Sequence, residues 1–125
     1  MQGFGTFRQR REPRLDAIIV GLFMATIAMG VITYQRSHRR GRWIPALGLT
    51  HGALGLVAVA LLTFRAVTGP ENLWFNSAIF LFLLTLIGGA FAFLVRRRDE
   101  APILPVVLLH AVAAVVAFLV LLGGL

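Results

Sequence analysis

The sequence predicts an all-α membrane protein, a bundle of four transmembrane helices, and three observations lead to this fold class. Of the 125 residues, 58% are hydrophobic and only 14% are charged, whereas soluble domains contain about 25% charged residues. The charges are grouped at 8–16, 36–42 and 96–100. The apolar stretches between them have about the 20 residues that a helix needs to cross a bilayer. This composition excludes a disordered tail and argues against a water-soluble domain.

The apolar stretches are delimited by recognisable signals. The first follows a basic segment and is not followed by a clear cleavage site, so we expect a retained helix rather than a signal peptide. Trp43 and Pro45 mark the start of the second, because tryptophan favours membrane interfaces and proline fits a first helical turn. Gly69-Pro70 is a turn signal before the third. We therefore predict helices over about 15–35, 44–67, 73–95 and 103–124.

The loops between these helices are short, so consecutive helices should be antiparallel neighbours in one membrane domain over 1–125. The first and third loops then lie on one side of the membrane with seven arginines, and the termini and the second loop lie on the other side with five. The positive-inside rule places the first and third loops in the cytoplasm. We expect an integral protein of the bacterial inner (cytoplasmic) membrane. The net charge of +7 does not indicate nucleic-acid binding, because the arginines lie at the ends of apolar runs.

The chain contains an internal repeat. Shifting the sequence by 59 positions aligns 16–62 with 75–121 without a gap, and 11 of the 47 pairs are identical. The scarcer residue types among these pairs carry the most weight: Thr26/Thr85, Gly30/Gly89, Arg39/Arg98 and His51/His110. Each unit is a helical hairpin that crosses the membrane twice, so we expect a pseudo-twofold axis along the membrane normal. Chance similarity between two apolar hairpins is the alternative.

Two histidines are the candidate functional residues. Ionisable residues inside a membrane helix are costly and indicate a functional site. His51 and His110 each follow the start of their helix by seven residues, a depth of about 10 Å. Both helices enter from the same side, so the two imidazoles should lie at one depth and face each other. His38 is in an arginine-rich loop and is expected to be a solvated polar residue.

The residues around the histidines are small. Gly48 and Gly55 flank His51, and Ala113 and Ala114 follow His110. Small residues allow close helix contact or leave room for a flat ligand. Two neutral imidazoles beside such a space match the axial ligation of one haem b iron. The alternatives are a histidine-mediated helix contact without a cofactor and, less favoured because a third ligand is lacking, a zinc site. The absence of cysteine excludes a disulfide and a c-type haem attachment.

Further residues would complete a haem site. The arginines on the histidine side could pair with the haem propionates, and we name Arg39, Arg42, Arg97 and Arg98 as candidates. Lipid phosphates are their alternative partners. A ligating histidine usually donates its second ring N–H to an acceptor. Thr26 and Thr85, or a nearby backbone carbonyl, could accept it, although a threonine hydroxyl more commonly bonds to the carbonyl one turn earlier.

The pattern resembles the small four-helix membrane b-type cytochromes, in which histidines on helices hold haem within a bundle. The matching residues are His51 in Leu49-Thr-His-Gly-Ala-Leu-Gly55 and His110 in Leu108-Leu-His-Ala-Val-Ala-Ala114. Small uncharacterised bacterial membrane proteins are similar to the segment from Gly88 to Leu122. Two-haem members of such families have two histidine pairs, whereas this chain has one, so a two-haem path across the membrane is not expected.

These observations predict a membrane electron-transfer subunit with one bis-histidine haem b, part of a larger redox or respiratory complex and not an enzyme by itself. Its expected partners are the lipid bilayer and other membrane subunits or further copies of the chain, and a quinone is a candidate beside the arginine loops. The alternative is a cofactor-free accessory or assembly subunit of a membrane complex. A proton-coupled transporter is disfavoured, because no acidic residue lies in the middle of a predicted helix.

Overall fold

The fold is a bundle of four antiparallel helices. The structure is a computed structural model that describes residues 13–96 and 100–125. Within this part of the chain the helices are α1 (Pro13–Arg40), α2 (Pro45–Thr68), α3 (Leu73–Val95) and α4 (Leu104–Gly123), and there is no strand. Each helix is long and apolar enough to cross a membrane. The predicted all-α, four-helix membrane fold is therefore confirmed.

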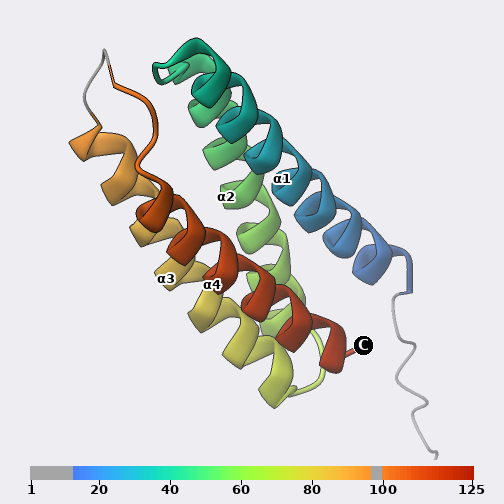
Figure 1. Cartoon of the computed structure of the whole chain (residues 1–125). Helices are drawn as coiled ribbons and strands as arrows, with labels where there is room; N and C mark the ends of the chain where they lie inside the picture. Colours follow the sequence, from blue (N-terminus) through green and yellow to red (C-terminus); the bar gives the residue numbers. More distant parts are fainter. Residues whose placement is uncertain (1–12, 97–99) are drawn as a thin grey trace, which may run out of the picture.

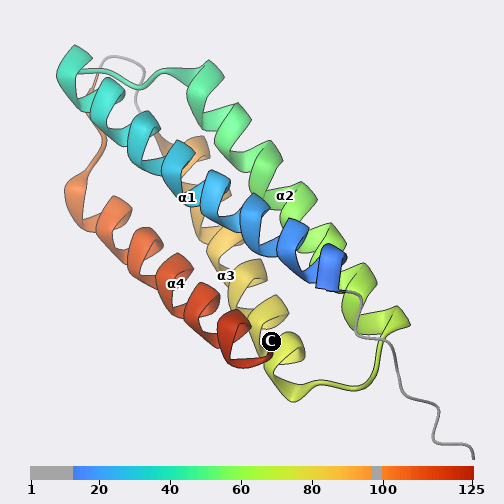
Figure 2. The same ribbon diagram turned by 90° about the vertical axis from the view of Figure 1, so that its right-hand side faces the viewer.

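The helices are arranged as a square in cross-section. α1 packs on α2, α2 on α3 and α3 on α4, with a smaller contact between α4 and α1. α1 and α3 are thus diagonal to each other, as are α2 and α4. The α1–α2 and α3–α4 loops lie at one end of the bundle, here called the loop end (Figures 1 and 2). The α2–α3 loop and the C-terminus lie at the other, here called the terminal end.

The end of α1 differs from the prediction. The helix continues five residues past the expected end, through Arg36–Arg40, because arginine favours the helix and cations near a helix C-terminus are stabilised by the helix dipole. Gly41 then ends it in the left-handed region at φ 62°. The backbone N–H of Gly41 donates to the carbonyl oxygen of His38 (3.0 Å), and that of Arg42 donates to the carbonyl oxygen of Ser37 (3.1 Å). This pair of hydrogen bonds is a Schellman motif.

Asn72 connects the start of α3 with the end of α4 at the terminal end of the bundle. Its side-chain oxygen accepts from the backbone N–H groups of Trp74 (3.0 Å) and Phe75 (3.4 Å), so it caps α3. Its amide donates to the carbonyl of Gly124 (3.0 Å). One side chain therefore caps the start of α3 and holds the residue that follows α4.

The buried apolar core occupies only part of the bundle. At its centre the rings of Phe23 and Phe82 stack across the α1–α3 diagonal, with centroids 3.9 Å apart and planes inclined by 11°. Among the described residues, the buried hydrophobic side chains other than Pro102 lie on the terminal-end side of the two membrane histidines: Ile19, Phe23, Ala58, Val59, Leu62, Phe75, Ala78, Phe82, Ala117 and Leu121. The apolar core is therefore in the terminal half, whereas the buried side chains of the loop half among the described residues are Thr33, Ser37 and Pro102.

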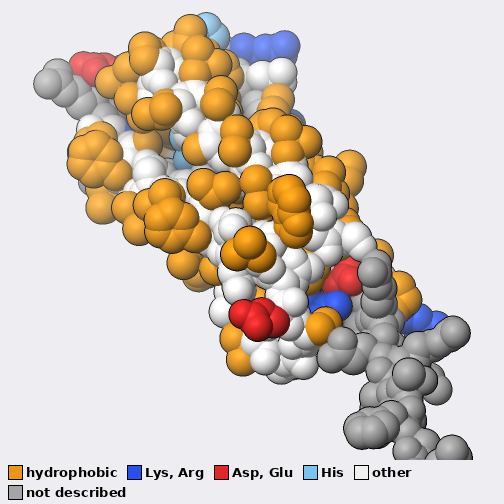
Figure 3. All heavy atoms as spheres, turned by 90° about the horizontal axis from the view of Figure 1, so that it is seen from below, with side chains coloured by type: hydrophobic (Ala, Val, Ile, Leu, Met, Phe, Trp, Pro, Cys, Tyr) orange, Lys and Arg blue, Asp and Glu red, His pale blue; other side chains and the backbone are white. Residues whose placement is uncertain are grey.

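The outer surface of the bundle is apolar. Large hydrophobic side chains of all four helices are exposed, among them Val67, Leu73, Leu94 and Leu109, each at least three-quarters accessible. Seen from the terminal end, such side chains cover much of the surface (Figure 3). A surface of this kind is compatible with lipid tails and not with water.

Candidate functional site

The two membrane histidines meet in the interior of the bundle. His51 of α2 and His110 of α4 face each other across the second diagonal, with ring centroids 6.0 Å apart and planes inclined by 78°. Both residues are partly buried. They are related by the 59-residue shift, and so are the stacked rings of Phe23 and Phe82. A twofold arrangement of the two hairpins would produce these two self-pairing contacts, although the axis itself stays a prediction.

Each imidazole packs on a glycine of the neighbouring helix. A Cβ atom added to Gly30 of α1 would lie 2.9 Å from Cε1 of His51, and one added to Gly89 of α3 would lie 2.8 Å from Cε1 of His110. Ordinary carbon contacts are about 3.5–4.0 Å. The two glycines are thus required for the rings to approach α1 and α3, which explains the Gly30/Gly89 match in the repeat.

The Nδ1 atoms of the two histidines lie beside corresponding backbone carbonyls. Nδ1 of His51 lies 2.9 Å from the carbonyl oxygen of Thr26. Since a carbonyl can only accept, this nitrogen carries the proton, and Nε2 keeps a lone pair. Nδ1 of His110 is buried beside the Thr85 carbonyl but makes no hydrogen bond of regular geometry. The threonine hydroxyls are not the acceptors, because they donate to the carbonyls of Leu22 and Leu81 (2.8 Å each).

The four predicted pocket residues have different surroundings. A Cβ at Gly48 would lie 3.1 Å from the ring of Phe93, and one at Gly55 would lie 3.5 Å from Cγ2 of Thr26. Gly48 therefore faces α3 and Gly55 faces α1. Ala113 and Ala114 are partly buried on α4. The space expected at Gly48 is filled by Phe93 in this structure.

The candidate propionate-binding arginines lie at the loop end. Arg39 lies in the last turn of α1, and Arg42 lies in the loop that follows this helix. Both side chains are exposed. Arg97 and Arg98 lie outside the described residues. Arg96 stacks its guanidinium on the ring of Phe93, 3.4 Å from the centroid, and donates to the Phe93 carbonyl. The third histidine, His38, is exposed on α1 and stacks on Tyr34.

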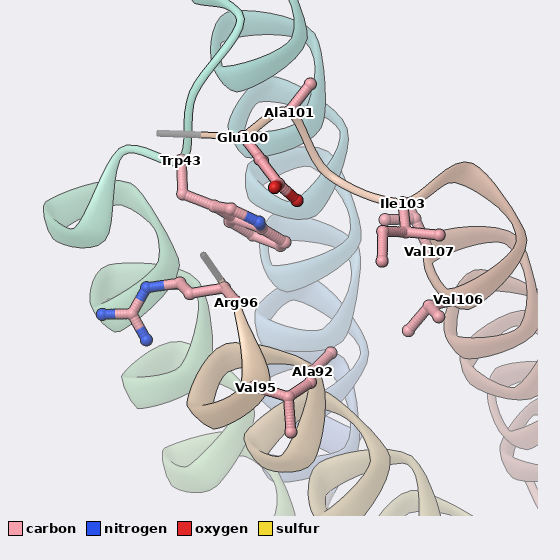
Figure 4. Close-up of a pocket in the computed structure, with 9 residues that line it drawn as sticks. All are labelled: Trp43, Ala92, Val95, Arg96, Glu100, Ala101, Ile103, Val106 and Val107. Carbon is pink, nitrogen blue, oxygen red and sulfur yellow. The ribbon is translucent and has the colours of Figure 1, made fainter. Parts of the chain in front are cut away.

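A small cavity of about 80 Å³ opens at the loop end, beside the start of α4 (Figure 4). The side chains of Trp43 and Glu100 point toward each other at its loop side, whereas the guanidinium of Arg96 points away. The remaining lining residues are small or aliphatic and come from α3, α4 and the loop between them: Ala92, Val95, Ala101, Ile103, Val106 and Val107.

Sequence reasoning missed a buried ion pair at the terminal end. Nε of Arg65 in α2 donates to Oδ1 of Asp16 in α1 at 2.9 Å, and their side chains are only 9% and 18% exposed. The guanidinium also lies 5.7 Å from the centroid of Phe75. The sequence contains the information needed to predict this pair. Asp16 lies in the first turn of α1 and Arg65 in the last turn of its antiparallel neighbour α2, so both lie at the same depth.

The donor set determines which metal or cofactor the site could hold. The described residues contain no group of three or more His, Cys, Asp or Glu side chains that could bind a metal ion. A closed zinc site needs about four ligands, so a bare metal ion is a poor match for two imidazoles. An iron porphyrin needs only two axial ligands from the protein. Comparison with family models, curated proteins and solved structures gives no match for this chain.

Proposed function

We propose that the chain is a membrane electron-transfer subunit that holds one haem b between His51 and His110. The observation that carries the proposal is the meeting of two imidazoles from diagonal helices at 6.0 Å in the bundle interior. Metal–imidazole bonds are about 2.0–2.1 Å long. Two such bonds and the radii of the two rings together span a centroid distance close to the one observed.

The hydrogen bond of His51 supports a ligand role. With Nδ1–H donated to the Thr26 carbonyl at 2.9 Å, the ring orientation is fixed and Nε2 is the nitrogen with a free lone pair. Backbone carbonyls commonly orient metal-ligating histidines in this way. Thr26 therefore acts through its backbone oxygen, as a positioning residue.

The position of the apolar core in the terminal half supports the entry of a flat ligand at the loop end. Pockets that enclose a ligand are about 300–1,000 Å³, so the cavity of about 80 Å³ is too small without a movement of the helices. Because the apolar core cluster of the described residues lies on the terminal-end side of the histidines, the hairpins can separate at the loop end without exposing that core. Arg39 and Arg42 lie at this end and would face the propionates.

A haem with both axial positions occupied transfers single electrons and does not bind a substrate at iron. The chain would therefore act as a carrier and not as an enzyme by itself. The histidine pair lies toward one end of the bundle, so a second redox centre must continue the path. Another membrane subunit, a second copy of this chain or a quinone would provide it.

The absorption spectrum of the protein purified in detergent tests the proposal. We expect a Soret band and sharp α and β bands on reduction. His51→Ala and His110→Ala should each lose the six-coordinate low-spin species, because one axial bond remains. His38→Ala is the matched control, since His38 is exposed, and should keep the parent spectrum. A folded, colourless parent protein, or an unchanged spectrum in His110→Ala, would refute the proposal.

The second candidate function is a cofactor-free accessory or assembly subunit of a membrane complex. The close packing of the imidazoles on Gly30 and Gly89, and of Phe93 on Gly48, favours it, because these contacts already occupy the interior. It predicts a colourless protein and a loss of about 1 kcal/mol of stability when either histidine is replaced.

A further inference from the structure

Two stacked phenylalanine rings lie next to the histidine pair on its terminal side. The imidazoles lie beside the carbonyls of Thr26 and Thr85. Phe23 and Phe82 each precede one of these threonines by three residues, which is about 4.5 Å along a helix. Their rings stack at 3.9 Å, and the two side chains are only 2% and 5% exposed. This phenylalanine pair therefore closes the interior of the bundle about one helical turn from the imidazoles.

A flat ligand between the histidines would meet the phenylalanine pair with one of its edges. The two axial ligands of a haem iron bind on opposite faces of the porphyrin. A porphyrin held between His51 of α2 and His110 of α4 therefore directs its edges toward α1, α3 and the two ends of the bundle. The edge on the terminal side faces Phe23 and Phe82, and the opposite edge faces the loop end.

The two sides of this interior differ in the cations that they offer to a carboxylate. Exposed arginines are clustered at the loop end: Arg36, Arg39, Arg40 and Arg42. On the terminal side, the cations among the described residues are Arg14, which is exposed, and Arg65, whose Nε is bonded to Asp16 at 2.9 Å. Arg65 follows His51 by fourteen residues on α2, which is about 21 Å along the helix. A carboxylate at the phenylalanine pair would therefore be buried without a cation, which is costly.

We propose that Phe23 and Phe82 determine the specificity of the site. They admit an iron porphyrin whose carboxylates are confined to one edge and reject one that has carboxylates around the whole ring. Haem b has its two propionates on one edge and only methyl and vinyl groups on the opposite edge, so its apolar edge matches the phenylalanine pair. The inference rests on the haem proposal above and adds to it the class of porphyrin and its orientation.

Three iron porphyrins that differ at only two ring positions test this inference. Iron protoporphyrin IX has vinyl groups at these positions, iron mesoporphyrin IX has ethyl groups and iron coproporphyrin III has propionates. Each is titrated into porphyrin-free protein in detergent, and binding is followed by quenching of the fluorescence of Trp43 and Trp74. The same titration of the double variant His51→Ala/His110→Ala corrects for porphyrin that enters the micelles.

We expect mesoporphyrin to bind as tightly as protoporphyrin, and coproporphyrin to bind at least about tenfold more weakly, because its additional carboxylates would be buried without a partner. Equal affinity for all three porphyrins would overturn this inference and leave the haem proposal standing. No binding of any of them beyond that of the double variant would refute both.

A pair of variants then tests the role of the phenylalanines. Phe82→Ala removes one ring of the stack and leaves space in which water can hydrate the additional carboxylates, so the preference for protoporphyrin over coproporphyrin should fall severalfold. Phe80→Ala is the matched control, because Phe80 is exposed on the same helix, and it should keep the parent preference. If Phe82→Ala folds and keeps the parent preference, the phenylalanine pair does not select the ligand. Phe82→Leu, a smaller change, provides the same comparison if the alanine variant does not fold.

Discussion

Replacing Gly30 or Gly89 by alanine should disturb the histidine pair directly. The added methyl group would lie 2.9 Å from Cε1 of His51 or 2.8 Å from Cε1 of His110. Because carbon contacts normally begin near about 3.5 Å, the ring must retreat by more than half an ångström. The centroid of the other imidazole is 6.0 Å away, so a displaced ring would change the geometry of the histidine pair.

The magnitude follows from two opposing effects. Alanine is favoured over glycine inside a helix by about 1 kcal/mol, whereas overpacking a filled interior costs about 1–3 kcal/mol. At an open position only the first effect operates. Gly88 has nothing within 4 Å of its added Cβ, and neither has Gly21. We therefore expect Gly88→Ala and Gly21→Ala to be stabilising by about 1 kcal/mol, and Gly89→Ala and Gly30→Ala to be less stable than these controls by about 1–3 kcal/mol.

The assay is the free energy of unfolding in mixed detergent micelles, measured for each variant with its control on the same helix. The absorption spectrum of the same samples reports on the proposed haem site, where we expect weaker retention in Gly30→Ala and Gly89→Ala only. If Gly89→Ala is as stable as Gly88→Ala and has the same spectrum, the ring does not pack on this glycine, and the reasoning about the site is wrong.

Three further predictions concern the ends of the bundle. Removing one partner of the buried pair, by Asp16→Asn or Arg65→Met, should cost about 3–5 kcal/mol, and the double variant should recover much of the loss, because an unpaired buried charge is the main penalty; a double-mutant cycle of unfolding free energies with a coupling near zero would contradict this. Asn72→Ala should cost about 1 kcal/mol of stability, because the cap of α3 is lost. Asn72→Asp keeps the capping acceptor and loses only the hydrogen bond to Gly124. Hydrogen exchange in the first turn of α3 should therefore increase in the alanine variant alone. Gly41→Ala should lower the unfolding free energy by roughly 1–2 kcal/mol, because an L-residue is strained in the left-handed region; an asparagine there should cost less, and equal stability of all three proteins would argue against the left-handed turn.

The number and the positions of the helices could be predicted because the apolar runs are long and their limits are strong local signals. The prediction is wrong at the end of α1, because the clustered charges of 36–40 belong to the helix and not to the loop. Charge alone does not end a helix, and Gly41, which does, was inside the predicted loop. The start of α3 agrees with the sequence because Asn72 is a local capping residue.

The histidine pair could be predicted because depth in the membrane follows from counting residues along helices of fixed rise. The side-chain packing around it could not be predicted in this way. That Phe93 fills the space at Gly48 depends on rotamers and on the crossing of α2 with α3. The Thr26 carbonyl was named only as one of two possible acceptors, since sequence does not distinguish a backbone oxygen from the hydroxyl of the same residue.

The position of the core in one half of the bundle has a consequence for assembly. The terminal end is fastened by the Phe23–Phe82 stack, the Asp16–Arg65 ion pair and the bond from Asn72 to Gly124. The loop end has no comparable cluster of buried apolar side chains among the described residues. The two hairpins are thus joined most firmly at the terminal end and can move apart most easily at the loop end. We therefore expect the chain to insert and fold first. A flat ligand would then enter by a small separation of the hairpins at the loop end, without unfolding of the bundle.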